Sequence, residues 1–378
     1  MLEKKLLKNL DITLIIVTIA IIIFGLIIIS SATHVTQADR ADPFGKVLRQ
    51  SVSVLIGMGL VFLVLSFNYE DLGRYWKWLY GINIALLLIV ELKGRIAGGA
   101  QSWIEIGPLV VQPSEFAKIS IIITFAHYLS KQQGKLNTFW NLVPSLIHFG
   151  VPMFLILIQP DLGTALVFVA IMFGMLFVAG ARPMHLLSMI GAGIAAFVGI
   201  VYAHVAFGLK IPLEAYQIKR LTIFLDPYSD PAGAGYHVIQ SQIAIGSGGL
   251  VGKGLFKGMQ NQLNFLPAQH TDFIFSVVGE ELGFIGASVL LGLFLIMVVR
   301  MIRIAAQAKD TFGTLMVTGV AAMIVFHILV NVGMTVSMMP ITGIPLPFFS
   351  YGGSSMMTNL IAVGIVLNVH MRRQKLLF

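Results

Sequence analysis

The stretch ITLIIVTIAIIIFGLIIIS, residues 12–30, holds 19 consecutive residues without a charged side chain. A helix needs about 20 mostly apolar residues to cross a bilayer, whereas the apolar region of a cleaved signal peptide has only about 7–15. Three lysines, Lys4, Lys5 and Lys8, precede the stretch. The pattern therefore predicts a retained membrane span whose N-terminal end lies in the cytoplasm.

The whole chain shares this apolar character. Of its 378 residues, 57% are hydrophobic and only 11% are charged, against roughly 25% charged in a typical soluble domain. This balance excludes an ordinary soluble enzyme, a disordered protein and a nucleic-acid-binding domain. The formal charge of +8 is explained more simply by basic residues that anchor membrane spans at the cytoplasmic side than by nucleic-acid binding. Because the chain has no cysteine, a disulfide, a zinc–thiolate site and a thiol nucleophile are excluded as well.

Nine more apolar segments follow, so the predicted fold class is an all-α integral membrane protein, a single polytopic domain with ten transmembrane helices. The predicted spans lie near 12–30, 47–67, 75–92, 114–130, 142–158, 162–180, 184–207, 273–299, 314–338 and 353–370. The short loops assigned to the cytoplasm carry 14 lysine and arginine residues, and those assigned outside carry five. This excess predicts that both termini are cytoplasmic.

The one long interruption of the pattern is the segment 208–272, which this topology places outside the cell between the seventh and eighth spans. Within it, Tyr236, Ile239 and Ile243 recur at helical spacing. The spacing predicts a short amphipathic helix that lies on the membrane or dips into it. A structured loop of this length is usually functional.

Charged side chains within the apolar segments are candidates for a functional site, because they are costly at membrane depth. Glu115 and Lys118 lie three residues apart and share a helix face. They form either a salt bridge that only holds the bundle together or a polar cavity wall that contacts an anionic head group. Asp161, in QPDLG, either caps the sixth span or lines the same cavity.

Asp272 differs from these residues because it lies where the long loop enters the eighth span, in LPAQHTDFIF at 266–275. Partial burial at this boundary would raise the pKa of the carboxyl group and make it a better base near neutral pH. The alternative is an N-cap formed by Thr271 or Asp272. On the residues alone, the cap is favoured.

Six motifs together resemble the SEDS family (shape, elongation, division and sporulation proteins), most closely its RodA-type rod-shape members. They are GAQSWIEIG at 99–107, QPSEFAK at 112–118, QPDLGTAL at 159–166, YQIKRLTIFLDPYSDPAGAGYHVIQSQIAIGSGGLVGKGL at 216–255, LPAQHTDFIFSVVGEELG at 266–283 and GIPLPFFSYGGSS at 343–355. They run from the third span to the last in family order. The short N-terminus and the length resemble RodA-type members rather than the FtsW-type division members.

The resemblance implies a peptidoglycan glycosyltransferase that polymerises lipid II at the outer face of the cytoplasmic membrane during cell-wall elongation. The family's essential aspartate matches Asp272, which would act as the general base while undecaprenyl pyrophosphate leaves. Cations near the pyrophosphate would come from Lys118, Lys219, Arg220 and Lys253. Whether a divalent cation, Mg²⁺ or Mn²⁺, shares this task stays open, and no metal ligand is assigned.

Further substrate-binding positions follow from the same resemblance. Trp103 either anchors a helix end at the interface or stacks on a sugar in the cavity. Glu115, Lys118 and Asp161 match polar positions of the family's cavity, and Gln240 is carried over from the long loop.

Partners are implied as well: a class B penicillin-binding protein, which is a single-span transpeptidase, and other membrane proteins of the elongation complex, but no nucleic acid. We expect the transpeptidase on the face of the eighth and ninth spans, where Gly283, Gly286, Gly292 and Gly319 would allow close approach. Two other functions stay open, a flippase for the lipid-linked precursor and a scaffold. A flippase needs polar groups along a path through the membrane, whereas a polymerase needs a base at one surface.

Overall fold

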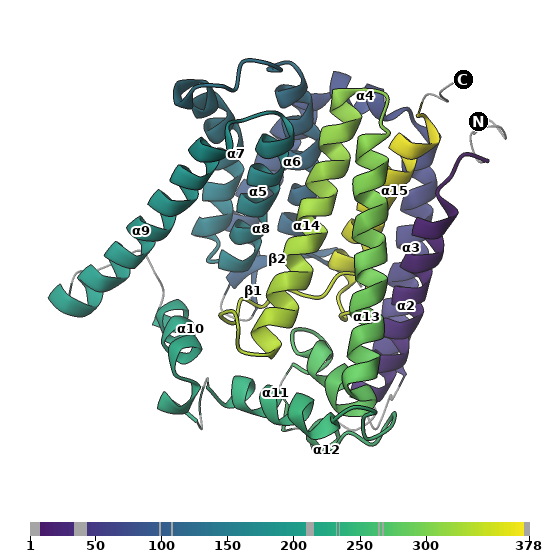
Figure 1. Ribbon diagram of the computed structural model, residues 1–378, viewed down its shortest axis with the longest axis vertical. Coiled ribbons are helices and arrows are strands. Elements are labelled where there is room, and N and C mark those ends of the chain that lie inside the picture. Colours follow the sequence, from purple (N-terminus) through teal and green to yellow (C-terminus); the bar gives the residue numbers. More distant parts are fainter. Residues whose placement is uncertain are drawn as a thin grey trace.

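The computed structural model describes residues 8–33, 44–97, 100–106, 109–208, 215–231, 233, 235–263, 265–266 and 268–373. These ranges form a bundle of roughly parallel and antiparallel helices (Figure 1). The helices over the predicted spans are α2 (Ile12–Thr33), α3 (Gly45–Ser66), α5 (Trp76–Lys93), α6 (Pro113–Ser130), α7 (Phe139–Ile158), α8 (Leu162–Val178), α9 (Pro183–Phe207), α13 (Ile274–Ala306), α14 (Thr311–Thr335) and α15 (Gly353–Met371).

Within the described part of the chain, seven of these helices are long and apolar enough to cross a membrane: α2, α3, α7, α9, α13, α14 and α15. The chain is therefore a multi-pass membrane protein. Helix α8 is also apolar but has only 17 residues, and both α5 and α6 carry charged side chains.

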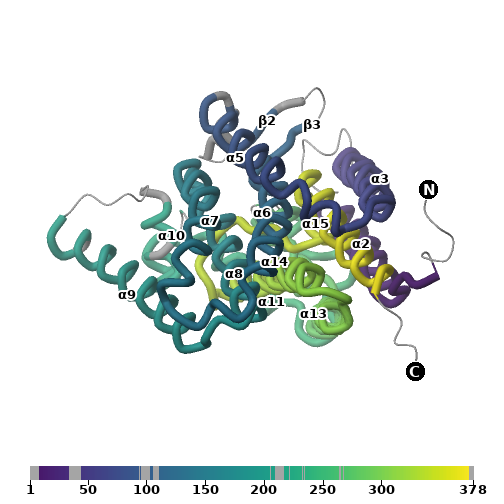
Figure 2. The backbone as a smooth tube through the Cα atoms, turned by 90° about the horizontal axis from the view of Figure 1, so that it is seen from above, coloured from purple at the N-terminus to yellow at the C-terminus, as the bar shows by residue number. Residues whose placement is uncertain are grey.

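Helix α14 lies inside the bundle, in contact with α6, α8, α13 and α15, whereas α15 packs mainly on α3 (Figure 2). Helix α9 diverges from the bundle in both views and has α8 as its main neighbour. The faces of α8 and α9 that turn toward each other are thus left partly uncovered.

The two ends of the bundle differ. Both termini and the short helix α4 (Tyr69–Arg74) lie at one end, and the helices of the long loop lie at the other (Figure 1). The loop helices are α10 (Ala215–Leu225), the 3-10 helix η1 (Pro227–Ser229), α11 (Gly235–Gly248) and α12 (Met259–Gln262). Helix α11 occupies the segment in which helical spacing was recognised.

A small antiparallel sheet follows α5 and was not predicted. Its strands are β1 (Arg95–Ala97), β2 (Ala100–Ile106) and β3 (Leu109–Val111), in the order β1-β2-β3. In the register, Trp103 on β2 pairs with Arg95 and Glu105 pairs with Val110. The prediction of helices alone was incomplete here because these strands are too short for their alternation to stand out beside the apolar spans.

The long loop is built into α13. Gly283 has φ 64° and interrupts the helix, and the amides that follow it donate to the carbonyl oxygens of Gly249 and Leu250 in the loop. The side chains of Glu280 and Glu281, just before the break, are fully buried. The loop is therefore anchored to this helix by backbone hydrogen bonds.

The same contacts correct the prediction that four glycines form an open docking face. A Cβ on Gly283 would lie 2.4 Å from a backbone nitrogen of the loop, and one on Gly319 would lie 2.8 Å from a side chain of α8. Both positions are covered by the chain itself because they pack inside the fold. Gly292, on α13, has no atom within 4 Å of its Cβ position and stays open.

Candidate functional site

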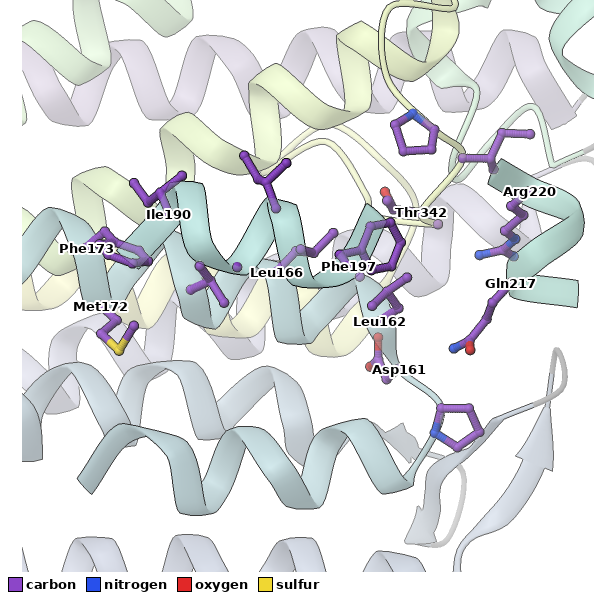
Figure 3. A pocket seen from close by; sticks show the side chains of 18 of the residues that line it. Asp161, Leu162, Leu166, Met172, Phe173, Ile190, Phe197, Gln217, Arg220 and Thr342 are labelled. Carbon is purple, nitrogen blue, oxygen red and sulfur yellow. The ribbon is translucent and has the colours of Figure 1, made fainter. Parts of the chain in front are cut away.

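A cavity of about 680 Å³ opens between α8, α9, α10 and the segment before α15. Its lining changes character along its length, as Figure 3 shows. Apolar side chains cover most of it, including Leu162, Leu166, Val169, Met172, Phe173, Met189, Ile190, Ile194 and Phe197. Polar or amphipathic side chains gather at one end: Trp103, Gln112, Asp161, Gln217, Arg220 and Thr342. The shape suits a ligand with a long apolar part and a polar head.

Asp161 fills both roles between which the sequence could not decide. It is the N-cap residue of α8, and its Oδ1 accepts a hydrogen bond from the Thr164 amide (3.0 Å). Its Oδ2 accepts from the Thr164 hydroxyl (2.8 Å), from Gln112 Nε2 (3.2 Å) and from the Ser114 hydroxyl (3.4 Å). The same carboxylate lines the cavity. These bonds fix its orientation at the polar end.

A smaller polar pocket of about 50 Å³ adjoins this end and shares Gln112, Asp161, Gly163 and Gly343 with the large cavity. Glu115 and Lys118 line only the smaller pocket. Lys118 is 1% exposed and is not among the residues that line the large cavity, so its contact with an anionic head group stays a prediction. The burial follows from its place on the inner face of α6.

Lys118 is held by two partners. Its Nζ donates to Glu115 Oε1 (2.7 Å) and lies 3.3 Å from His327 Nε2 on α14. The other polar atoms of these partners, Glu115 Oε2 and His327 Nδ1, are buried and find no hydrogen-bond partner among the residues that the structure describes. The pocket has room for a water molecule, and buried polar atoms of this kind are usually satisfied by water.

Asp272 lies in the turn that precedes α13 and does not cap the helix. The N-cap residue is Phe273, and no side chain caps the helix. Asp272 Oδ2 lies 3.6 Å from the Cβ position of Gly343, a residue that lines both cavities. Asn331 Nδ2 donates to the carbonyl oxygens of Asp272 (2.9 Å) and Ile344 (2.8 Å), which joins the turn to the segment before α15. The backbone of the turn is thus fixed, and the carboxylate lies next to Gly343, although Asp272 itself is not among the residues that line either cavity.

Burial raises the pKa of the Asp272 carboxyl above its usual value, and the positive charge of Arg220 and a hydrogen bond from Thr271 partly oppose this shift. Arg220 reaches the site from α10 and lines the large cavity. A carboxylate with a raised pKa, next to a guanidinium group, can accept a proton while the cation stabilises a nearby anion.

Three further predicted binding residues line neither the large cavity nor the smaller pocket. Lys219 is exposed and pairs with Asp230 (2.7 Å). Lys253 pairs with the buried Glu280 (2.8 Å) at the junction with α13. Gln240 lies on α11 and is not among the residues that line any of the described cavities.

The structure adds residues that were not predicted. Gln112 and Gln217 lie within the quoted motifs and could have been read from them, whereas His327 lies in an apolar stretch without any local signal. Among the described residues, no three His, Asp or Glu side chains converge as a metal site built by the protein alone would require.

Comparison with known proteins gives the family. A family model described as "Cell cycle protein", which covers FtsW, RodA and SpoVE, matches residues 11–375. The chain belongs to the FtsW/RodA/SpoVE family. Stage V sporulation protein E of Bacillus subtilis is 39% identical to this family member over 95% of this chain and 96% of its own. Peptidoglycan glycosyltransferase MrdB of Escherichia coli K12 is 37% identical over 97% and 95%.

Solved members of the family share the fold. A chain from a peptidoglycan synthase complex, studied for its structural coordination of polymerization and crosslinking, has a TM-score of 0.79 and 36% identity, over 96% of this chain and 97% of that one. The rod shape determining protein RodA of Thermus thermophilus has a TM-score of 0.70 and 30% identity, over 97% and 98%. A stage V sporulation protein, proteins named FtsW and a rod shape determining protein all occur among the relatives, so similarity alone assigns the family and not the RodA subtype.

Proposed function

We propose that this chain is a peptidoglycan glycosyltransferase that joins lipid II units into glycan strands. The observation that carries the proposal is the cavity between α8 and α9, which is apolar over most of its length and polar at the end where Asp272 lies. Lipid II likewise has an apolar part and a polar part, because its polyprenyl chain stays in the bilayer and its sugars stay at the surface. Curated relatives named as peptidoglycan glycosyltransferases support the same activity.

The proposal includes an orientation of the chain in the membrane. We infer ten spans, with both termini in the cytoplasm and the long loop outside. Basic side chains near the end that holds the termini support this orientation. They are Arg74, Lys77, Arg300, Arg303, Lys309, Arg372 and Arg373. Asp272 would then lie at the outer surface, where the sugars of lipid II are found.

The chemistry follows from the groups at this end of the cavity. Asp272 takes the proton from the 4-hydroxyl group of the acceptor N-acetylglucosamine, and the freed oxygen attacks the anomeric carbon of the donor N-acetylmuramic acid. The bond from that carbon to the pyrophosphate oxygen breaks, and undecaprenyl pyrophosphate leaves. Arg220 stabilises the negative charge that develops on the leaving group. Trp103 at the same end offers an aromatic face to a sugar.

Filling the apolar part of the cavity should weaken substrate binding. Gly193 lines the cavity and has no atom within 4 Å of its Cβ position, so Gly193→Trp puts a large side chain into the space without displacing the protein. We expect the KM for lipid II to rise at least about tenfold, the scale of roughly 1.4 kcal/mol of lost binding. The measurement is polymer formation in proteoliposomes at varied lipid II.

Gly199→Trp is the matched control, because Gly199 lies on the same helix with equally open surroundings but does not line the cavity. It should leave the KM unchanged. An equal rise in both variants would mean that the bilayer-facing surface of α9, rather than the cavity, is being disturbed. An unchanged KM in Gly193→Trp would remove the cavity from the proposal.

A flippase is less well supported by this lining. The polar side chains of the large cavity gather at one end, and apolar side chains line the rest, whereas transport of the sugars would need polar groups along the whole path. Reconstitution separates the two functions. Glycan polymer from purified lipid II supports the glycosyltransferase, and lipid scrambling without polymer would support the flippase.

We further propose a role in cell-wall elongation with a class B penicillin-binding protein as partner. The solved relative in a peptidoglycan synthase complex supports such a partner. Its single span would dock on the open face of α13 around Gly292, where Phe284, Val289 and Leu295 are exposed, with a contribution from α14 at Leu329. These exposed side chains would pack against the incoming helix.

Photo-crosslinkers at Val289 and Leu295 should capture the elongation transpeptidase in membranes that contain both transpeptidases. A crosslinker at Phe154, on the lipid-facing side of α7, is the matched control and should capture neither. Capture of the division transpeptidase would contradict the elongation role, and capture only from α7 would contradict the docking face.

A further inference from the structure

A second surface pocket lies at the opposite end from Asp272. It has a volume of about 300 Å³ and is formed by the turn between α6 and α7 together with the first two turns of α7. The turn that joins the end of α6 to the start of α7 lies at the same end of the bundle as α4 (Figure 1), so the pocket lies at this end as well. It is lined by Tyr128, Gln132, Gly134, Lys135, Asn137, Trp140, Asn141 and Pro144.

The turn that forms the pocket is held in place by its own polar side chains. Asn137 Nδ2 donates to the Gly134 carbonyl oxygen (3.3 Å), and Asn141 Nδ2 donates to the Lys135 carbonyl oxygen. Gln133 binds the hydroxyl group of Thr311, which attaches the turn to α14. Gly134 has φ +74°, a conformation that favours glycine. Among the described residues, the hydrogen bonds that hold the turn come from Asn137 and Asn141 and not from the side chain of Lys135.

The charge around this pocket favours an anion. Lys131 and Lys135 are exposed, and the chain has no Asp or Glu between Glu115 and Asp161. Thr311, which the turn contacts through Gln133, follows Asp310, and the carboxylate of Asp310 already caps α14 and accepts a hydrogen bond from Tyr69 (2.9 Å).

Exposed apolar side chains continue from the pocket along α7. Trp140, Pro144, Ile147, Val151 and Phe154 follow one another at intervals of four and three residues, which places them on one face of the helix. Trp140 is 80% exposed, and Ile147, Val151 and Phe154 are exposed as well. A tryptophan beside a lysine at the end of a span is typical of the membrane interface, and the apolar face below it could receive acyl chains.

We propose that the pocket binds an anionic glycerophospholipid of the adjacent leaflet. Lys135 would pair with its phosphate, the amide groups of the turn would contact its head group, and its acyl chains would lie along the exposed face of α7. Basic pockets between spans bind anionic lipid head groups for this reason. The exposed apolar face of α7 favours a lipid over free phosphate as the ligand, because a soluble anion would make no contact with that face.

The test uses the purified full chain in a neutral detergent and a fluorescent phosphatidylglycerol as the probe. Lys135→Gln should weaken binding about tenfold, the scale of one charge-assisted contact, and Trp140→Ala should weaken it severalfold. Lys77→Gln is the matched control, because Lys77 lies at the same end of the bundle but outside the pocket. It should bind the probe as the native chain does.

Competitors distinguish the source of the phosphate. Unlabelled phosphatidylglycerol should displace the probe, while phosphatidylcholine and glycerol phosphate should not. Native affinity in Lys135→Gln, an equal loss in Lys77→Gln, or displacement by either of the last two competitors would overturn the proposal. Unfolding midpoints measured without lipid should agree among the variants, because the side chains exchanged do not hold the turn.

Discussion

Asp272→Asn should lower glycan polymer formation from lipid II by about two to four orders of magnitude, the usual contribution of a general base. Asparagine keeps the size and hydrogen-bonding capacity of the side chain but cannot take up a proton from the acceptor hydroxyl. The turn is held through the Asp272 carbonyl oxygen, which accepts from Asn331, so the substitution leaves that bond in place. Polymer length and yield in proteoliposomes with the transpeptidase measure the effect.

The matched control is Asp226→Asn, another aspartate of the long loop. Asp226 caps the 3-10 helix through its side chain, a task that asparagine performs equally well, so activity should stay at the native level. Lipid II binding and the unfolding midpoint of Asp272→Asn should match those of the native chain. Polymer formation that survives in this variant would exclude Asp272 as the base.

The pH dependence gives an independent check on the same carboxyl group. Because burial raises its pKa and a base must be ionised, activity should be lost as the pH falls through this raised pKa, closer to neutrality than for an ordinary aspartate. Arg220 opposes the shift, so Arg220→Gln should raise the pKa further and move the acid limb to higher pH. Lys219→Gln removes the ion pair with Asp230 and should leave the acid limb at the same pH. An acid limb that Arg220→Gln does not move would show that another group sets it.

Within the described residues, seven of the ten predicted spans coincide with helices that are long and apolar enough to cross a membrane. They could be predicted because side chains that face lipid or a neighbouring helix are apolar, which leaves a signal within about 20 residues. Asp272 could be placed at a boundary for the same reason, since the apolar run begins directly after it. The sequence could not predict that Asp272 does not cap the helix, because an aspartate at that position can serve either as an N-cap or as a base. The choice depends on Phe273 and Asn331, and Asn331 is 59 residues away.

Long-range pairing explains why other predicted residues lie away from the cavity. Lys253 was predicted as a cation near the pyrophosphate, yet it pairs with the buried Glu280, which precedes the break in α13. Lys219 and Arg220 are adjacent, so only one of them can turn toward the cavity, and the sequence does not say which. A histidine within an apolar helix gives no sign of its partner, and His327 meets a lysine 209 residues away.

Lys118→Met should destabilise the fold strongly. This prediction tests whether Lys118 stabilises the helix bundle or binds the substrate. Lys118 is the cation that faces Glu115 within the bundle, with His327 on its other side. Removing one member of a buried ion pair leaves an uncompensated charge and costs about 3–5 kcal/mol. The midpoint of thermal unfolding in detergent should therefore fall clearly below that of the native chain. Lys257→Met, at an exposed position in the loop, is the control, and its midpoint of thermal unfolding should equal that of the native chain.

The double variant Glu115→Leu with Lys118→Met tests the cause. Replacing both charges by apolar groups of similar volume removes the unpaired carboxylate, so its midpoint should rise above that of Lys118→Met. If polymer formation returns with the midpoint, the pair serves the bundle, and the notion of a head-group contact for Lys118 fails. If stability returns while activity does not, the polar pocket beside Asp272 takes part in the reaction. A single variant as stable as the native chain would mean that water already compensates the carboxylate in this pocket.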